Sequence, residues 1–129
     1  MSTRDPAIAG APGIRIVDPG ADRDALVRLY RSAWVTVLPA FREAFGLVVV
    51  ESLACGTPVV GMRDGGAVPA LIGEEHLIAE PDPRSLAQTL LRALEAEPDP
   101  AASRRRAEQY SIERCAERYE SLYEELLAA

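Results

Sequence analysis

Short runs of apolar residues alternate with longer segments of mixed polarity along most of the chain. Residues 14–17 (Ile-Arg-Ile-Val), 34–38 (Trp-Val-Thr-Val-Leu), 58–62 (Pro-Val-Val-Gly-Met) and 77–79 (Leu-Ile-Ala) are such runs. Apolar, β-branched runs of this length between turn-forming residues are typical of β-strands. The pattern predicts four strands, of which the second and third are candidates for buried, parallel positions.

Segments whose apolar residues have helical spacing lie between these runs. One helix is predicted after Asp22 and another after Asp82 and Pro83, because aspartate caps helix N-termini and proline suits the first helical turn. In both segments apolar residues recur three and four positions apart, which forms one buried face. The predicted faces consist of Leu26, Leu29, Tyr30 and Ala33 in the first helix and of Leu86, Leu90, Leu91 and Leu94 in the second.

The segment 47–55 carries conflicting signals. Its first residues, Leu-Val-Val-Val, favour a strand, whereas Glu51 to Cys55 before Gly56 favour a helix that ends at a glycine. Two parallel strands need a connection of about a dozen residues or more between them. Because only a helix here supplies that connection between residues 34–38 and 58–62, a helix is predicted.

A short helical turn is predicted at residues 70–72, and after residue 100 the chain is predicted to be helical to its end, with Ser111 as the cap of the last helix. The stripe of this helix that is predicted to pack consists of Ile112, Cys115, Tyr119, Leu122 and Leu126. The whole order indicates an α/β fold, with a partial Rossmann-like parallel sheet of about four strands flanked by helices and a C-terminal helical tail. Residues 1–13 are predicted to be a flexible leader and residues 14–129 a single domain.

Size and charge limit the class of the protein. The 129 residues suffice for one domain with one core. No apolar run approaches the roughly 18 residues of a membrane span, and the N-terminus lacks the apolar segment of a signal peptide, so a cytoplasmic protein is expected. A net charge of −6 argues against nucleic acid. A single nucleotide can still be held by backbone N–H groups at a helix N-terminus.

Some catalytic groups are excluded by composition and spacing. Every basic side chain except that of His76 is arginine, so the chain offers no catalytic or phosphate-binding lysine. Cys55 and Cys115 have neither metal-site nor redox-pair spacing and are expected to be reduced structural thiols, with a disulfide as the alternative. His76 is expected on the surface or in a loop rather than as a catalytic base, and no metal site is predicted.

Two glutamates are candidates for chemistry. Glu51 lies in the otherwise apolar helix predicted for residues 47–55, and a buried carboxylate without partners is costly. Glu51 is therefore hydrogen-bonded, turned toward a cleft, or on a solvent-facing side of the helix. Glu43 precedes the same helix, where it binds a ligand, interacts favourably with the helix dipole, or is a plain surface residue.

Glycines mark two places where a ligand can approach the backbone. Gly46 stands at the predicted helix start, where N–H groups point outward and can bind an anion. Gly65 and Gly66 follow a predicted strand, at the carboxyl end of a parallel sheet, where such folds bind ligands. An ordinary turn is the alternative for this pair.

These residues belong to one longer pattern in fixed register. The pattern consists of Pro39, Glu43, Phe45, Gly46, Glu51, Ala54, Gly56, Pro58, Val59, Val60, Gly65 and Gly66. It resembles the signature of the group 1 glycosyltransferases, a family of retaining enzymes with two Rossmann-like domains (the GT-B architecture) and a Glu-x7-Glu motif. The resemblance covers nearly the whole chain after residue 13 and implies the nucleotide-sugar-binding C-terminal domain, in truncated form.

The resemblance also implies roles for the matching residues. Glu51 would accept hydrogen bonds from the ribose hydroxyls of a nucleotide-sugar donor, and Glu43, as the catalytic residue, would contact hydroxyls of the transferred sugar. Backbone N–H groups at the helix start would face the sugar and the diphosphate, so that a helix N-terminus rather than a metal stabilises the leaving group. The donor-binding residues implied are Phe45, Gly46, Leu47, Glu51, Gly65 and Gly66. Apart from the nucleotide-diphosphate sugar as donor substrate, no cofactor is implied.

The sequence departs from the family pattern in three respects. Nothing before residue 14 resembles the family's Gly-Arg…Lys segment, whose basic pair grips the diphosphate, and the acceptor-binding first domain is absent. Arg42 and Arg63 lie near the motif and are the candidates to substitute as phosphate contacts. Ala70 stands where the family usually has a glutamate, which affects the expected loop geometry. We therefore expect the domain to be incomplete as a catalyst when alone.

The missing segment has a structural consequence as well. In a Rossmann sheet of order 3-2-1-4-5-6, the predicted strands correspond to the third to sixth, and the first two are missing from between the third and fourth. Either residues 14–17 pair directly beside residues 34–38, or another chain fills the gap. Since an unpaired strand edge favours association, a homodimer or a partner chain that carries the missing domain is expected.

Three functional interpretations fit these observations. The chain is a fragment or split subunit of a glycosyltransferase, active when completed; or a binding module that retains nucleotide or nucleotide-sugar affinity without transfer; or a degenerate domain that serves in assembly. Titration with nucleoside diphosphates and their sugars separates the last interpretation from the first two.

Overall fold

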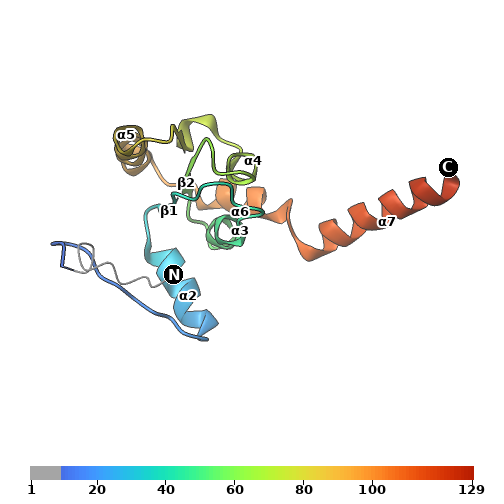
Figure 1. The fold of residues 1–129 in the computed structure, drawn as a ribbon. Helices are drawn as coiled ribbons and strands as arrows, with labels where there is room; N and C mark the ends of the chain where they lie inside the picture. The colour runs from blue at the N-terminus through green and yellow to red at the C-terminus, as the bar shows by residue number, and fades with distance from the viewer. Residues whose placement is uncertain (1–9) are drawn as a thin grey trace.

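The computed structural model describes residues 10–129 and has a small parallel sheet at its centre (Figure 1). The strands β1 (Thr36–Leu38), β2 (Val59–Met62) and β3 (Ile78–Ala79) are adjacent in that order. Both neighbouring pairs are parallel, with Thr36 opposite Val59 in the first pair. Three of the predicted strands and the α/β class are therefore confirmed.

The strand predicted at residues 14–17, the first along the chain, is wrong. This segment has no regular structure and pairs with none of the three strands described. The side chains of Ile14, Ile16 and Val17 are about half exposed, and the segment, blue in Figure 1, lies away from the sheet. A β-branched run becomes a strand only where a sheet edge receives its hydrogen bonds and neighbours pack against its side chains. Pairing of these residues beside β1, one of the two alternatives given above, is therefore not what the structure has. Residues 1–9 of the predicted leader lie outside the described residues.

Helices connect and flank the strands. They are α2 (Arg23–Ser32), α3 (Leu47–Ala54), α4 (Val68–Ile72), the 3₁₀ turn η1 (Glu75–Leu77), α5 (Pro83–Glu95), α6 (Pro100–Glu108) and α7 (Ile112–Ala128). α3 supplies the crossover between β1 and β2, so the helix predicted for residues 47–55 is confirmed. α3 packs against α6 and α4, and α5 packs against β2 and β3.

Polar side chains fix the starts of four helices. Asp22, Asp82, Asp99 and Ser111 each accept a hydrogen bond from the backbone N–H three residues further along the chain. Such caps satisfy N–H groups that have no partner inside the helix. The predicted caps of α2, α5 and α7 are confirmed, and Asp99 adds the cap of α6.

The core lies where α3, β2 and α4 meet. Its buried apolar side chains are Val49, Leu53, Val59, Val60, Val68, Leu71, Ile72, Leu77, Ile78 and Ala107. Gly61 of β2 permits the close approach of α4, because a Cβ atom at this position would lie 2.5 Å from Cγ1 of Val68. The short strands are therefore held mainly by the packing of helices onto β2.

Buried hydroxyl groups join α2 and α3 to the sheet. The hydroxyl of Thr57 donates a 2.6 Å hydrogen bond to the carbonyl of Tyr30 near the end of α2. Ser52 of α3 is fully buried, and its Oγ lies 3.0 Å from the carbonyl of Thr57 and 2.8 Å from Oγ1 of Thr36. Since unpaired buried polar groups are costly, this network fixes how α2 and α3 lie against β1.

The last helix, α7, does not pack as the sequence predicts. It projects from the rest of the fold as an isolated arm (Figure 1), and none of its residues is buried. Its predicted stripe is exposed to solvent, including Ile112, 84% exposed, and Leu126, 65% exposed. The predicted helix and the spacing of its apolar residues are therefore confirmed, whereas the predicted packing of this stripe is wrong. None of the helices among residues 10–129 is both long and apolar enough to cross a membrane.

Candidate functional site

The loops that follow β1 and β2 are joined at the carboxyl ends of these strands. The backbone N–H of Arg42 donates to the carbonyl of Asp64 at 3.0 Å, and the N–H of Ala67 donates to the carbonyl of Glu43 at 3.1 Å. Carboxyl ends of parallel strands lie at one edge of the sheet, where α/β folds bind ligands. The structure therefore brings Glu43 and the Gly65–Gly66 turn together.

Glycine is required at this junction. Gly66 has a φ of +67°, and a Cβ atom there would lie only 2.3 Å from the carbonyl oxygen of Glu43. At Gly65 a Cβ atom would lie 2.8 Å from the carbonyl oxygen of Met62. A side chain at Gly66 would push the two loops apart, and one at Gly65 would clash with the end of β2, so this turn is more specialised than an ordinary one.

The start of α3 opens beside the same junction. Gly46 occupies the cap position with a φ of 88° and makes no capping hydrogen bond from a side chain. A Cβ atom at Gly46 would meet Leu71 at 3.2 Å and Cγ of Glu43 at 3.5 Å, so the Glu43 side chain runs beside the helix start. The first N–H groups of an α-helix have no intrahelical partner and favour an anion.

Phe45 and Leu47 flank this helix start on its solvent side. Phe45 is 46% exposed and Leu47 is 64% exposed. The ring of Phe45 also lines a groove of about 340 Å³ at the base of α7, together with Tyr110 and Tyr119. Gly46 itself is buried, so the side chains of Phe45 and Leu47 form the exposed surface at this helix start.

Glu51 is exposed rather than buried, and it has a hydrogen-bond partner. The hydroxyl of Tyr30 in α2 donates to Oε2 of Glu51 at 3.2 Å. Partial burial of the ring and the neighbouring carboxylate raise the pKa of Tyr30 to about 12. Glu51 lies one helical turn after Leu47, and therefore on the same face of α3 as the helix start.

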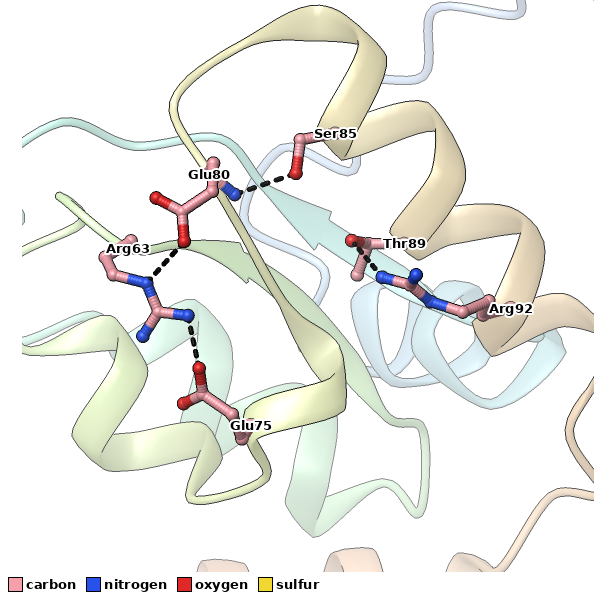
Figure 2. A network of polar contacts seen from close by, with 6 residues as sticks. All are labelled: Arg63, Glu75, Glu80, Ser85, Thr89 and Arg92. Atoms are coloured by element: carbon pink, nitrogen blue, oxygen red, sulfur yellow. Dashed lines mark hydrogen bonds and ion pairs between the residues drawn. The ribbon is translucent and has the colours of Figure 1, made fainter.

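Arg63 is bound by two carboxylates. Its guanidinium pairs with Glu75 and donates a 2.7 Å hydrogen bond to Oε1 of Glu80, as Figure 2 shows. These contacts raise the pKa of Arg63 and lower the pKa of the Glu75 carboxyl. The backbone N–H of Glu80 donates to Oγ of Ser85 at 2.9 Å, which positions the second carboxylate. The positive charge of Arg63 is thus largely balanced within the fold.

Arg42 is the more available cation near the junction. Its φ of 53° is unusual for a residue other than glycine, and its guanidinium lies 4.9 Å from the centre of the Phe41 ring. Among residues 10–129, no ion pair involves Arg42. A backbone in this strained region is typical of functional loops.

Three residues outside the motif hold Glu51 and the neighbouring helix α4 in place. The sequence predicts Tyr30 only as an apolar position of α2 and misses its contact with Glu51. The signal was its hydroxyl, since a tyrosine hydroxyl usually finds a polar partner. Arg106 of α6 donates to the carbonyls of Ala70 and Leu71, and the hydroxyl of Tyr110 donates to Ala70 at 3.2 Å. Ala70 lies in helix α4 rather than in a loop, and the end of this helix is held by Arg106 of α6 and by Tyr110.

His76 lies on the surface as predicted, whereas the structural role predicted for both thiols does not hold for Cys115, which is exposed. Cys55 and Cys115 are free thiols, the second of them exposed. His76 is a surface residue whose side chain is 63% exposed, with Nε2 3.5 Å from Oε2 of Glu74. The structure places neither the thiols nor the imidazole beside Glu43.

Comparison with known proteins identifies a family that the chain matches. The sequence pattern of the family described as "Glycosyl transferases group 1" matches residues 16–114. The chain is 37% identical over 122 residues to a D-inositol 3-phosphate glycosyltransferase of Saccharomonospora viridis, covering 89% of this chain and 28% of that protein. It is 45% identical over 82 residues to a D-inositol 3-phosphate glycosyltransferase of Acidothermus cellulolyticus, covering 62% of this chain and 18% of that protein. The chain thus spans less than a third of the length of these relatives.

The fold and the junction of its loops define an α/β domain of the kind that binds ligands at the carboxyl ends of parallel strands. The family match covers most of the chain, including the whole segment from Pro39 to Gly66. The chain belongs to the group 1 glycosyl transferases.

Proposed function

We propose that the chain is the donor-binding domain of a retaining glycosyltransferase of the GT-B type, and that it holds a nucleotide-diphosphate sugar at the carboxyl ends of β1 and β2. The observation that carries this proposal is the joining of the Glu43 loop to the Gly65–Gly66 turn beside the uncapped start of α3. A helix N-terminus at strand ends favours bound phosphate groups. Membership of the family supports a sugar nucleotide as the ligand.

The diphosphate and the sugar occupy the helix start. Backbone N–H groups around Phe45, Gly46 and Leu47 face the leaving group, and the partial positive charge of the helix N-terminus stabilises the negative charge that develops there. Glu43 contacts hydroxyls of the transferred sugar, because its side chain runs beside Gly46. Gly65 and Gly66 keep the second loop close enough to complete this side of the site.

The nucleoside lies along the exposed face of α3. Glu51 accepts hydrogen bonds from the ribose hydroxyls, and bonds to an ionised acceptor are about twice as strong as neutral ones. Tyr30 donates to Oε2 only, so Oε1 stays available for a hydroxyl donor. In this proposal Arg42 is the first candidate for a phosphate contact and Arg63 the second, since Arg63 must first exchange a carboxylate partner.

Transfer also requires a site for the acceptor. The proposal places the acceptor site on a separate domain, and the partner is either a chain that carries that domain or a second copy of this one. The expected cytoplasmic location is part of the same proposal.

One observation favours a second candidate function, that of a binding module without transfer. Glu75 and Glu80 hold Arg63, the cation that directly follows β2. A leaving diphosphate then has fewer cationic partners, and loss of one such stabilising group commonly costs about 10²–10³ in rate. Binding through Glu51 and the helix start is affected less than transfer.

Isothermal titration calorimetry tests the binding step. The chain is titrated with a panel of nucleoside diphosphates and their sugars, and we expect one nucleotide to bind. Glu51→Ala should weaken that binding by about tenfold or more, since two hydrogen bonds to a charged acceptor are lost. The matched control, Glu95→Ala at the exposed end of α5, should bind like the parent chain.

Failure of every ligand in the panel to bind a folded parent chain contradicts both candidate functions. Equal affinity of the Glu51→Ala and Glu95→Ala variants contradicts the role of Glu51 alone. Sugar transfer or donor hydrolysis in the presence of a supplied family N-terminal domain distinguishes the enzyme from the binding module.

A further inference from the structure

Arg106 of α6 closes the end of α4. Its Nε donates a 2.9 Å hydrogen bond to the carbonyl of Leu71, and a terminal nitrogen of the guanidinium donates to the carbonyl of Ala70. The hydroxyl of Tyr110 accepts a 3.2 Å hydrogen bond from the same guanidinium and donates another to the carbonyl of Ala70. The last carbonyls of a helix have no intrahelical partner, and a cation beside them is favourable. Arg106 therefore supplies both the donors and the charge that stabilise the end of α4.

The fold reserves a place for this guanidinium. Gly73, which ends α4, has a φ of +70°, and a Cβ atom there would lie 2.6 Å from Cζ of Arg106. The guanidinium thus occupies the space that a side chain at Gly73 would fill. On another side it lies 5.6 Å from the centre of the Tyr110 ring. Among residues 10–129 no ion pair involves Arg106, so carbonyl and hydroxyl oxygens rather than a carboxylate hold it.

Helix α4 needs this support because it is short. It has five residues, and Ala67 at its start makes no capping hydrogen bond from its side chain. A helix of this length is not stable by itself in water. Its buried side chains Val68, Leu71 and Ile72 hold it to the core, and Arg106 fixes its end.

Helix α4 in turn supports the loop of Glu43. The N–H of Leu71 donates to the carbonyl of Ala67 at 3.1 Å, and the N–H of Ala67 donates to the carbonyl of Glu43 at 3.1 Å. Because Arg106 binds the carbonyl of Leu71, a chain of three hydrogen bonds leads from its guanidinium through α4 to the backbone of Glu43.

Side chains of α4 also border the start of α3. A Cβ atom at Gly46 would lie 3.2 Å from Cδ1 of Leu71 and 3.4 Å from Cγ2 of Val68. Glu51 has a different support, since its hydrogen bond comes from Tyr30 of α2. The two halves of the candidate site are therefore held from different helices.

We propose that Arg106 is a positioning residue for recognition of the transferred sugar. It acts through α4 on the Glu43 loop and on the helix start at Gly46, and it does not touch the ligand. The nucleoside is recognised through Glu51 and does not depend on Arg106. This inference rests on the proposed function, in which Glu43 faces the sugar of the donor.

Calorimetric titration with a nucleoside diphosphate and with its sugar derivative tests this role. The ratio of the two dissociation constants measures what the sugar contributes to binding. In Arg106→Ala the ratio should change by about five- to tenfold to the disadvantage of the sugar derivative, because the Glu43 loop is held less firmly. The affinity for the nucleoside diphosphate should fall less than about threefold. Arg105→Ala, the matched control, removes the same charge from the neighbouring exposed position of α6 and should leave both affinities unchanged.

Two milder variants keep the test decisive if Arg106→Ala folds poorly. Arg106→Lys retains the charge and a donor at the end of α4, so the ratio should return part of the way to that of the parent chain. Tyr110→Phe removes only the hydroxyl that donates to Ala70 and should change the ratio about twofold in the same direction as Arg106→Ala. Circular dichroism establishes that each variant is folded.

Hydrogen exchange tests the route through α4 without any ligand. In Arg106→Ala the N–H groups of Leu71 and Ala67 should exchange faster. The N–H of Cys55, which donates to the carbonyl of Glu51, should keep its rate. Equal acceleration at all three positions would show a general loss of stability and overturn the positioning role.

The titration separates this inference from the proposed function. A folded parent chain that binds neither ligand overturns the proposed function, and the role of Arg106 in sugar recognition with it. A parent chain that binds both ligands, together with an Arg106→Ala variant in which the ratio is unchanged, overturns the role of Arg106 alone.

Discussion

The hydroxyl of Tyr30 donates a hydrogen bond of 3.2 Å to Oε2 of Glu51 and so links α2 to α3 beside the candidate site. The bond holds the Glu51 side chain in one orientation although the carboxylate is exposed. A carboxylate can accept several hydrogen bonds, so the link still leaves Oε1 free. Tyr30 is therefore a positioning residue for Glu51, and its titration reports on the link.

Tyr30→Phe should reduce the loss of stability at alkaline pH. The pKa of Tyr30 rises from 10.0 to about 12 in the folded chain. Between these values the unfolded chain releases the proton and the folded chain keeps it, so the stabilisation is complete below pH 10 and is lost as the pH approaches 12. Urea unfolding at pH 9 and pH 11 should show a larger decrease for the parent than for Tyr30→Phe. Because the chain has no lysine, no lysine side chain titrates in this pH range. Equal decreases would contradict the link.

Gly66→Ala should destabilise the junction of the two loops. The new Cβ atom would lie 2.3 Å from the carbonyl oxygen of Glu43, in addition to the cost of a φ of +67°. The control is Gly20→Ala, at a φ of +56° with no atom within 4 Å of the added Cβ, which isolates the conformational cost of about 1 kcal/mol. We expect the free energy of unfolding to fall by about 2 kcal/mol more for Gly66→Ala. Similar losses for the two variants would mean that the loops separate without cost.

Features with local causes are predictable from the sequence. The caps Asp22, Asp82 and Ser111 depend on hydrogen bonds only three residues away, and all are confirmed. The helical state of residues 47–54 conflicts with the β-propensity of its valines, and it is predictable only because two parallel strands need a crossover.

Features that depend on a distant partner are not predictable in this way. Residues 14–17 have the composition of a strand but pair with none of the three described strands, and the stripe of α7 has the spacing of a packed face but stays exposed. For the site, the motif implies only that Glu43 and Gly66 belong to one donor site. It contains no signal for the carboxylates that hold Arg63, because Glu75 and Glu80 come from the next crossover and from the end of β3.

Thr57→Val should loosen the end of α2. Thr57 is 3% exposed, and its hydroxyl donates a 2.6 Å hydrogen bond to the carbonyl of Tyr30. Valine has the same shape without the donor, so the free energy of unfolding should fall by about 1–2 kcal/mol. Hydrogen exchange of the Ala33 N–H, which donates to the same carbonyl, should accelerate. Ser32→Ala, which removes an exposed hydroxyl, should change the stability by less than about 0.5 kcal/mol. Equal effects of the two substitutions would contradict the proposal that the Thr57 hydroxyl holds the end of α2.

Arg42→Ala should weaken the binding of a nucleoside diphosphate more than Arg63→Ala does. Arg42 lies in the loop that follows β1 and Arg63 directly follows β2, but Arg63 is paired with Glu75 and Glu80, whereas no ion pair among residues 10–129 involves Arg42. Loss of an available cation next to phosphate should reduce the affinity about tenfold, and loss of a neutralised one less than about twofold. Calorimetric titration at two salt concentrations measures both effects, since the contribution of Arg42 should shrink with added salt. If Arg63→Ala has the larger effect, the carboxylates release Arg63 to the ligand, and the cation that follows β2 rather than β1 contacts the diphosphate.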